Sequence, residues 1–221
     1  MRRSITRRIA KLIATAAFVA APAAHAGLTI GGITFADDSF ADQLLASSGV
    51  YTTSGGSLAA VLTDTSLASW AMSTSPGAFV TLAFNDNLVV NGAGNDIALF
   101  ERGHEAYEYS QEGFDSFNIT INGITRLYFT TETTTIVDDH NVNMTMLDLS
   151  FFGIAEGATI DRLQIGMDYD TRGSLPQLML VGAIHSVTAV PEPATWASML
   201  LGMLGLGGIA WRRGRRTVRS D

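Results

Sequence analysis

The stretch that decides the fold class runs from residue 116 to residue 130 and reads SFNITINGITRLYFT. Phe117, Ile119 and Ile121 alternate with polar residues, so they share one face of a β-strand. Asn122-Gly123 follows and supplies the positive φ angles that a two-residue hairpin turn requires. The stretch therefore predicts a β-hairpin that joins Ser116–Ile121 to Ile124–Thr130.

The same kind of pattern fills residues 27–190 on both sides of this hairpin. Short apolar or alternating runs are separated by Gly, Asn, Asp and Ser, which is typical of strands joined by turns. Phe40–Ala46 has near-helical apolar spacing and is predicted as one short helix. Thr130–Thr135 is predicted as a solvated strand end or a loop, with a glycosylated tract as the weaker alternative. The remaining predicted strands are Leu28–Phe35, Ser57–Leu62, Ala78–Phe84, Asp96–Glu101, Val142–Leu149, Thr159–Met167 and Gln177–Val187.

These elements predict an all-β fold, a jelly-roll-like β-sandwich of about nine strands. The chain of 221 residues has room for one such domain, and it contains no cysteine. Disulfides, thiolate metal sites and cysteine nucleophiles are therefore excluded. Residues 27–190 contain four arginines, no lysine and nineteen acidic residues. A domain with net charge near −15 lacks the basic surface that nucleic-acid binding needs.

The first 26 residues have the order of a secretory signal peptide. A basic start precedes the apolar run Leu12–Ala21, and Ala24-His25-Ala26 offers the small residues that signal peptidase accepts. We expect cleavage between Ala26 and Gly27. Thr6–Lys11 also resembles a twin-arginine export signal, so both export routes stay open.

The C-terminal 32 residues, 190–221, form a second targeting segment behind the domain at 27–189. Ala194–Trp211 is free of charge and long enough as a helix, roughly 27 Å, to cross a bilayer. Arginines hold the end of such a helix in the cytoplasm, which places the domain outside the inner membrane. Four of them follow the helix directly: Arg212, Arg213, Arg215 and Arg216.

The motif Pro191-Glu192-Pro193, the apolar helix and the arginine cluster together resemble the PEP-CTERM sorting tail. This resemblance implies that an exosortase recognises the tail and cleaves near Pro191–Pro193. It also implies delivery to the cell envelope or extracellular matrix of a Gram-negative bacterium that makes exopolysaccharide. A plain inner-membrane anchor is the alternative.

The central domain resembles galactose-binding-like jelly rolls at Gly94–Glu101, Leu147–Ser150 and Leu175–Ala183. The resemblance implies loops that hold sugars and a structural calcium ion. Gln177 departs from it, because an Asp is expected at that position.

Candidate ligands for calcium are Asp96, Asp168 and Asp170, which lie in loops rich in Asp and Asn. Such residues are also ordinary turn formers, so a purely structural role stays open. Candidate sugar-binding residues are Trp70, Tyr169 and Arg172, since sugar sites combine flat rings with hydrogen-bonding groups.

Catalytic motifs are absent from the sequence. There is no Gly-x-Ser-x-Gly elbow, and His104-Glu105 lacks the second histidine of a zinc-protease helix. We therefore predict a non-enzymatic protein that binds polysaccharide. A calcium-bridged adhesive surface protein and a secreted carbohydrate-active enzyme are the alternatives.

Overall fold

The computed structural model describes residues 27–106, 115–167 and 175–188. Within these ranges no helix is long and apolar enough to cross a membrane. Several predicted features lie outside the described residues: the signal peptide with Ala24 and Ala26, the sorting motif, the transmembrane helix and the arginine cluster.

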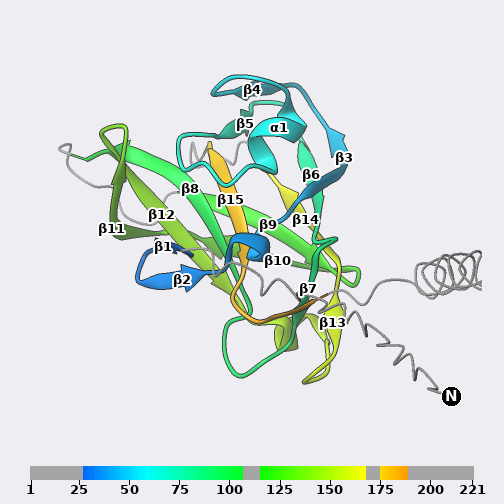
Figure 1. The fold of residues 1–221 in the computed structure, drawn as a ribbon. Helices are drawn as coiled ribbons and strands as arrows, with labels where there is room; N and C mark the ends of the chain where they lie inside the picture. The colour runs from blue at the N-terminus through cyan, green and yellow to red at the C-terminus, as the bar shows by residue number, and fades with distance from the viewer. Residues whose placement is uncertain (1–26, 107–114, 168–174, 189–221) are drawn as a thin grey trace, which may run out of the picture.

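Two antiparallel sheets form most of the fold (Figure 1). The five-stranded sheet has the order β10 (Ile124–Phe129), β9 (Ser116–Ile121), β14 (Arg162–Gly166), β6 (Phe79–Ala83) and β3 (Gln43–Ser48). The six-stranded sheet has the order β11 (Thr131–Val137), β12 (His140–Leu147), β8 (Ile97–Glu105), β15 (Leu178–Ala183), β5 (Ala71–Ser73) and β4 (Tyr51–Thr53).

Smaller elements complete the described chain. A hairpin pairs β1 (Leu28–Ile30) with β2 (Ile33–Phe35), and a three-stranded sheet has the order β13 (Thr159–Ile160), β7 (Asn87–Val90) and β16 (Ser186–Thr188). Helical structure is limited to α1 (Leu58–Leu62) and the 3-10 turns η1 (Asp37–Ser39) and η2 (Leu149–Phe152). The fold is therefore all-β, as the sequence predicts.

The main hydrophobic core lies between the inner faces of the two large sheets. Ile119 and Ile165 of the five-stranded sheet belong to the same buried cluster as Leu99 and Val181 of the six-stranded sheet, and all four are at most 1% exposed. Their alternation with outward-facing residues is the period-2 pattern that the sequence shows.

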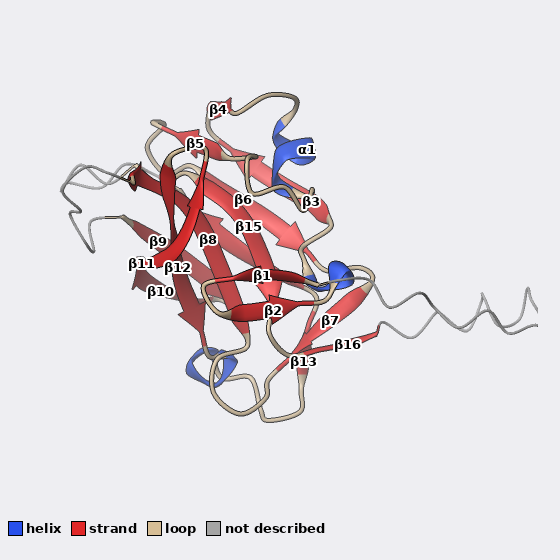
Figure 2. Cartoon of the chain, turned by 60° about the vertical axis from the view of Figure 1, so that its left-hand side comes forward, coloured by secondary structure: helices blue, strands red, loops and turns tan. Residues whose placement is uncertain are grey.

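The outer face of the six-stranded sheet is covered by the β1–β2 hairpin (Figure 2). The Phe35 ring lies 5.3 Å from Phe40 and 5.6 Å from Phe100, between ring centroids. Gly182 of β15 allows this approach, because a Cβ atom there would lie 2.9 Å from the Phe35 ring. Strand β15 and residues 97–101 of β8 are thus buried on both faces, which explains the unbroken buried run of β15.

The predicted hairpin at residues 116–130 is confirmed, with φ of 52° at Asn122 and 75° at Gly123. The predicted strands at 78–84, 96–101 and 142–149 appear as β6, β8 and β12. Three other predicted strands each divide in two: 28–35 into β1 and β2, 159–167 into β13 and β14, and 177–187 into β15 and β16.

Two predicted elements are wrong in type. Ser57–Leu62 is predicted as a strand but contains α1, whose N-cap Ser57 accepts a hydrogen bond from the Ala60 backbone N–H. Phe40–Ala46 is predicted as a helix, but its second half belongs to β3, which pairs with β6. Tertiary pairing outweighs local spacing here, because β6 buries Val80 and Leu82 in the main core and Leu44 of β3 packs against that core. The Thr-rich stretch at 130–135 lies mainly in the edge strand β11.

Candidate functional site

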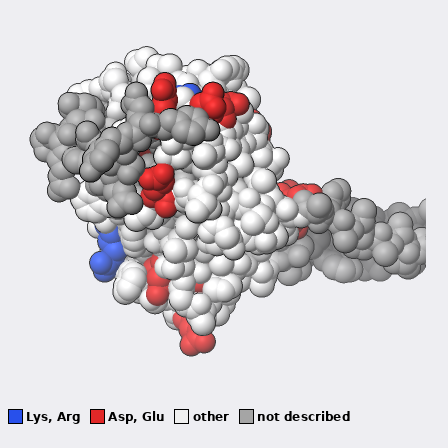
Figure 3. Space-filling view, turned by 90° about the vertical axis from the view of Figure 1, so that its left-hand side faces the viewer, with Lys and Arg blue, Asp and Glu red and all other residues white. Residues whose placement is uncertain are grey.

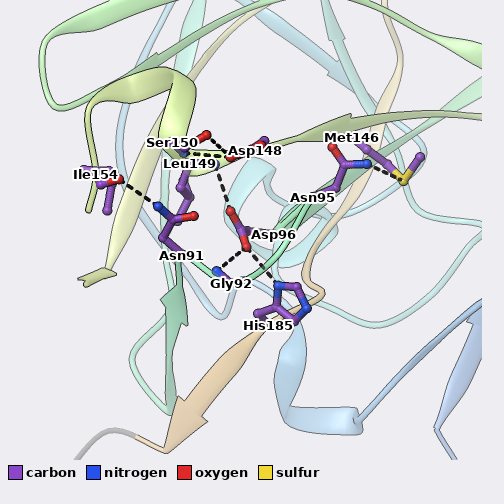
Figure 4. A network of polar contacts seen from close by, with 10 residues as sticks. All are labelled: Asn91, Gly92, Asn95, Asp96, Met146, Asp148, Leu149, Ser150, Ile154 and His185. Carbon is purple, nitrogen blue, oxygen red and sulfur yellow. Dashed lines mark hydrogen bonds and ion pairs between the residues drawn. The ribbon is translucent and has the colours of Figure 1, made fainter. Parts of the chain in front are cut away.

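Asp96 is fully buried just before β8, and its carboxylate joins three parts of the chain (Figure 4). Oδ1 accepts a hydrogen bond from the Gly92 backbone N–H at 2.7 Å and lies 2.9 Å from His185 Nδ1. Oδ2 accepts from the Leu149 backbone N–H at 2.8 Å. The carboxylate therefore ties the loop before β8 to η2 and to the turn between β15 and β16.

This geometry gives the predicted calcium site at Asp96 no support. N–H donors already occupy both carboxylate oxygens, whereas a calcium ion needs those oxygens turned toward itself. In the described ranges, no group of three or more His, Cys, Asp or Glu side chains is placed to hold a metal ion. Asp168 and Asp170 lie outside those ranges.

His185 is the exposed member of this network, with 38% of its side chain accessible. It lines an open groove of about 590 Å³ together with Thr34, Ser39 and Ser186. Gly92 makes room for the ring, because a Cβ there would lie 2.4 Å from His185 Nδ1. Among the described residues no hydroxyl group hydrogen-bonds the ring, so the pair lacks the bonded nucleophile of a catalytic triad.

Trp70 is a half-buried ring packed against the second hydrophobic cluster. The Arg102 guanidinium lies 5.6 Å from the ring centroid, a cation–π contact that covers one face of Trp70. The Nη2 atom of Arg102 also lies 3.1 Å from His140 Nδ1. The structure thus places Trp70 in a packed cluster, while Tyr169 and Arg172 lie outside the described residues.

Glu101 of β8 is a buried acid that the sequence analysis missed. Its Oε1 accepts hydrogen bonds from Thr130 Oγ1 at 2.5 Å and from Asn143 Nδ2 at 3.0 Å, and its Oε2 has no partner among the described residues. Burial, followed by the nearby charge of Asp115, raises the pKa of Glu101 from 4.5 to about 8. The strand alternation contains the signal, because Glu101 shares its face with the core residue Leu99.

The outer face of the five-stranded sheet carries two rows of uncharged side chains, which we call the neutral face. Strand register aligns one row across β10, β9, β14 and β6: Thr125, Thr120, Gln164 and Thr81. It aligns a second row across the same strands: Leu127, Asn118, Gly166 and Phe79. These residues alternate with core residues along each strand, so they point away from the core.

Both rows of the neutral face consist of uncharged residues. Thr120 and Thr125 are joined by a hydroxyl–hydroxyl bond of 2.7 Å. Gly166 adds no side chain, and a Cβ there would lie 3.1 Å from the Asn118 Cβ. Among the described residues of β14, Arg162 lies beside the rows, and it is paired with Asp161 at 2.6 Å. The face combines hydroxyl, amide and apolar groups, the chemistry that neutral sugars require.

Acidic side chains are distributed elsewhere on the domain. Figure 3 shows one side of the molecule, on which acidic side chains are separated by broad uncharged surface. The neutral face could not be recognised from the sequence, since it depends on the register of the β9–β10 hairpin against β14 and β6, which lie far apart in the chain.

A family model, the PEP-CTERM protein-sorting motif, matches residues 189–216. Comparison with curated proteins and with solved structures finds no match. The resemblance of the central domain to galactose-binding-like jelly rolls is not confirmed. The fold and the motif together define an exported all-β protein. It carries a PEP-CTERM sorting motif, which implies that an exosortase processes it after membrane anchoring.

We predict that Asp96→Asn lowers the free energy of unfolding by about 2–3 kcal/mol, because a buried charged acceptor loses hydrogen bonds. Asp148→Asn is the matched control: its side chain is only partly buried, and Asn caps η2 nearly as well as Asp. Urea unfolding of both variants measures the difference. Equal effects would contradict the structural role of Asp96.

We predict that Glu101→Gln stabilises the protein at alkaline pH. The folded state holds the Glu101 proton up to pH about 8, whereas the unfolded chain releases it near 4.5, so wild-type stability falls as pH rises through this window. Within this window, each pH unit lowers the free energy of unfolding of the wild type by about 1.4 kcal/mol. Urea unfolding at pH 4.5 and 8.5 should show the gain of the variant only at the higher pH. Glu105→Gln, exposed in the same strand, should show no such change.

Proposed function

We propose that the mature domain is a non-catalytic module that binds polysaccharide in the cell envelope or extracellular matrix. The neutral face is the observation that carries this proposal. Hydroxyl and amide groups there can pair with sugar hydroxyls, and the side chains of Leu127 and Phe79 offer apolar contact. We propose in addition that the sandwich is of the jelly-roll type and that the protein comes from a Gram-negative bacterium.

The absence of charge on this face is informative because the domain as a whole is strongly acidic. Residues 27–190 contain nineteen acidic residues against four arginines. Long-range repulsion therefore disfavours anionic polymers, and the eight positions of the two rows contain no carboxylate. A neutral polysaccharide is the ligand class that fits both observations.

The end of the domain suits release by an exosortase. The last described strand, β16, ends at Thr188 and pairs along its length with β7. Ala189 and Val190 alone separate it from Pro191, so the chain between strand and motif reaches roughly 10 Å at most. Before cleavage the domain stands close to the membrane, and cleavage near Pro191–Pro193 leaves β16 intact. At the other end, Gly27 directly precedes β1.

The alternative of an adhesive protein bridged by calcium ions rests on the strongly negative net charge of residues 27–190. The enzyme alternative rests on the Asp96–His185 pair and the groove beside it. Both alternatives are separated from polysaccharide binding by the experiments below.

We expect Glu192→Gln to block processing of the tail, because the substitution removes the charge of the sorting motif and leaves the domain untouched. Intact mass of the protein from its producing cells measures this. The wild-type chain should begin at Gly27 and end near Pro191–Pro193, whereas the variant should still reach Asp221. Glu156→Gln, an exposed change within the domain, serves as control. Normal processing of the Glu192 variant would count against the role of the motif.

We expect the double variant Asn118→Ala/Gln164→Ala to bind polysaccharide about tenfold more weakly, since each lost hydrogen bond is worth about 0.5–1.5 kcal/mol. Binding of the full chain to neutral exopolysaccharide isolated from the producing cells is measured by calorimetry. The control is Thr29→Ala/Thr34→Ala, which removes a similar exposed polar pair from the β1–β2 hairpin.

The same assay separates the alternatives. Binding through the neutral face should change little with added salt or EDTA. Loss of binding in EDTA would favour calcium bridging, and release of shortened sugars would favour an enzyme. Full affinity in the double variant would overturn the assignment of the neutral face.

A further inference from the structure

The free edges of the two large sheets differ in how they are protected. β3 and β11 each contain a register shift against their neighbours, and β4 is three residues long. Bulges and short strands are devices that prevent an edge from pairing with another chain. β10 has neither device, because its six residues pair with β9 in one continuous register.

The register also shows which backbone groups of β10 point outward. In a two-residue hairpin the residues that flank the turn, Ile121 and Ile124, exchange hydrogen bonds, and every second pair repeats this. The Thr130 backbone N–H, which donates to the Asp115 carbonyl at 3.0 Å, continues the same alternation. The N–H and C=O groups of Thr125 and Leu127 therefore point away from β9, where the described chain places no further strand.

Side chains along this edge favour association. Leu127 is 48% exposed and Phe129 is 40% exposed. The single charge of the strand, Arg126, is directed to η2: its Nε donates to the Phe151 carbonyl at 2.8 Å, and its guanidinium lies 5.7 Å from the Phe151 ring centroid. The edge thus lacks the free lysine or proline that usually blocks strand addition.

We propose that two copies of this chain associate by antiparallel pairing of their β10 strands, with the two-fold axis at Leu127. In this register Leu127 of each copy exchanges two backbone hydrogen bonds with Leu127 of the other, and Arg126 lies opposite Tyr128. The neighbouring register would place Arg126 opposite Arg126 of the second copy, and like charges directly opposite are destabilising. Electrostatics therefore disfavours the Arg126-centred register relative to the Leu127-centred one.

This pairing joins the two five-stranded sheets into one ten-stranded sheet. The neutral faces of both copies then become continuous, which lengthens the platform for an extended polymer. The dimer does not depend on polysaccharide binding, and its test is separate.

The absence of cysteine from the chain allows a direct test. The variant is Leu127→Cys in the full chain, exported by its producing cells. In the proposed dimer the two cysteines lie opposite each other on the paired strands, with their Cα atoms about 5.5 Å apart. A short bis-maleimide reagent should convert most of this variant to a covalent dimer. Val50→Cys, 79% exposed on another part of the domain, is the control and should stay monomeric.

A second variant tests the edge itself. Adding Thr125→Pro to Leu127→Cys removes an outward N–H and keeps the backbone hydrogen bonds between β10 and β9, although the exposed Thr120–Thr125 hydroxyl bond is lost. Cross-linking should therefore fall at least tenfold while the thermal unfolding transition stays cooperative. Cross-linking that is equal at positions 127 and 50, or that survives Thr125→Pro in the folded protein, would overturn the proposal. Absence of cross-linking at position 127 would do the same.

Discussion

The burial of β8 on both faces is the constraint on which the rest of the structure depends. One face of this strand contributes Ile97 and Leu99 to the main core, and the other contributes Ala98 and Phe100 to the cluster under the β1–β2 hairpin. Residues 97–101 of this strand cannot present polar groups to water, so a polar residue in or beside this stretch is either hydrogen-bonded within the protein or held in its neutral form. The hairpin and the buried carboxylates at Asp96 and Glu101 follow from this position.

The two buried carboxylates are accommodated in opposite ways. Asp96 receives two backbone N–H groups and faces His185, so donors from three segments surround it. Glu101 receives hydrogen bonds at one oxygen only, and burial raises its pKa to about 8, which keeps it neutral at physiological pH. Burial at the two ends of this stretch therefore has different results: Asp96 is hydrogen-bonded to three segments of the chain, and Glu101 retains its proton.

Local signals allowed the sequence to predict the hairpin at 116–130 and the all-β class, since alternation and Asn-Gly need no distant partner. Residues 57–62 and 40–46 were mispredicted because capping by Ser57 and pairing with β6 outweigh apolar spacing. Asp96 is predicted from the sequence as a candidate calcium ligand, whereas its actual partners at Gly92, Leu149 and His185 depend on distant segments and could not be foreseen. The neutral face was beyond prediction, because its residues meet only through strand register.

The two large sheets differ in what lies on their outer faces. The six-stranded sheet is covered on its outer side by apolar contacts of Phe35 and Phe40, so it serves stability. The five-stranded sheet has no such cover, and most of the outward positions in its two rows are hydroxyl or amide side chains such as Thr81, Thr120 and Gln164. The polar side chains allow this face to remain exposed to water. Its two rows contain no carboxylate, so they would not repel a ligand electrostatically. Its position on a regular sheet, rather than on loops, keeps the spacing of these groups fixed by strand geometry, which suits a ligand that is itself a regular polymer.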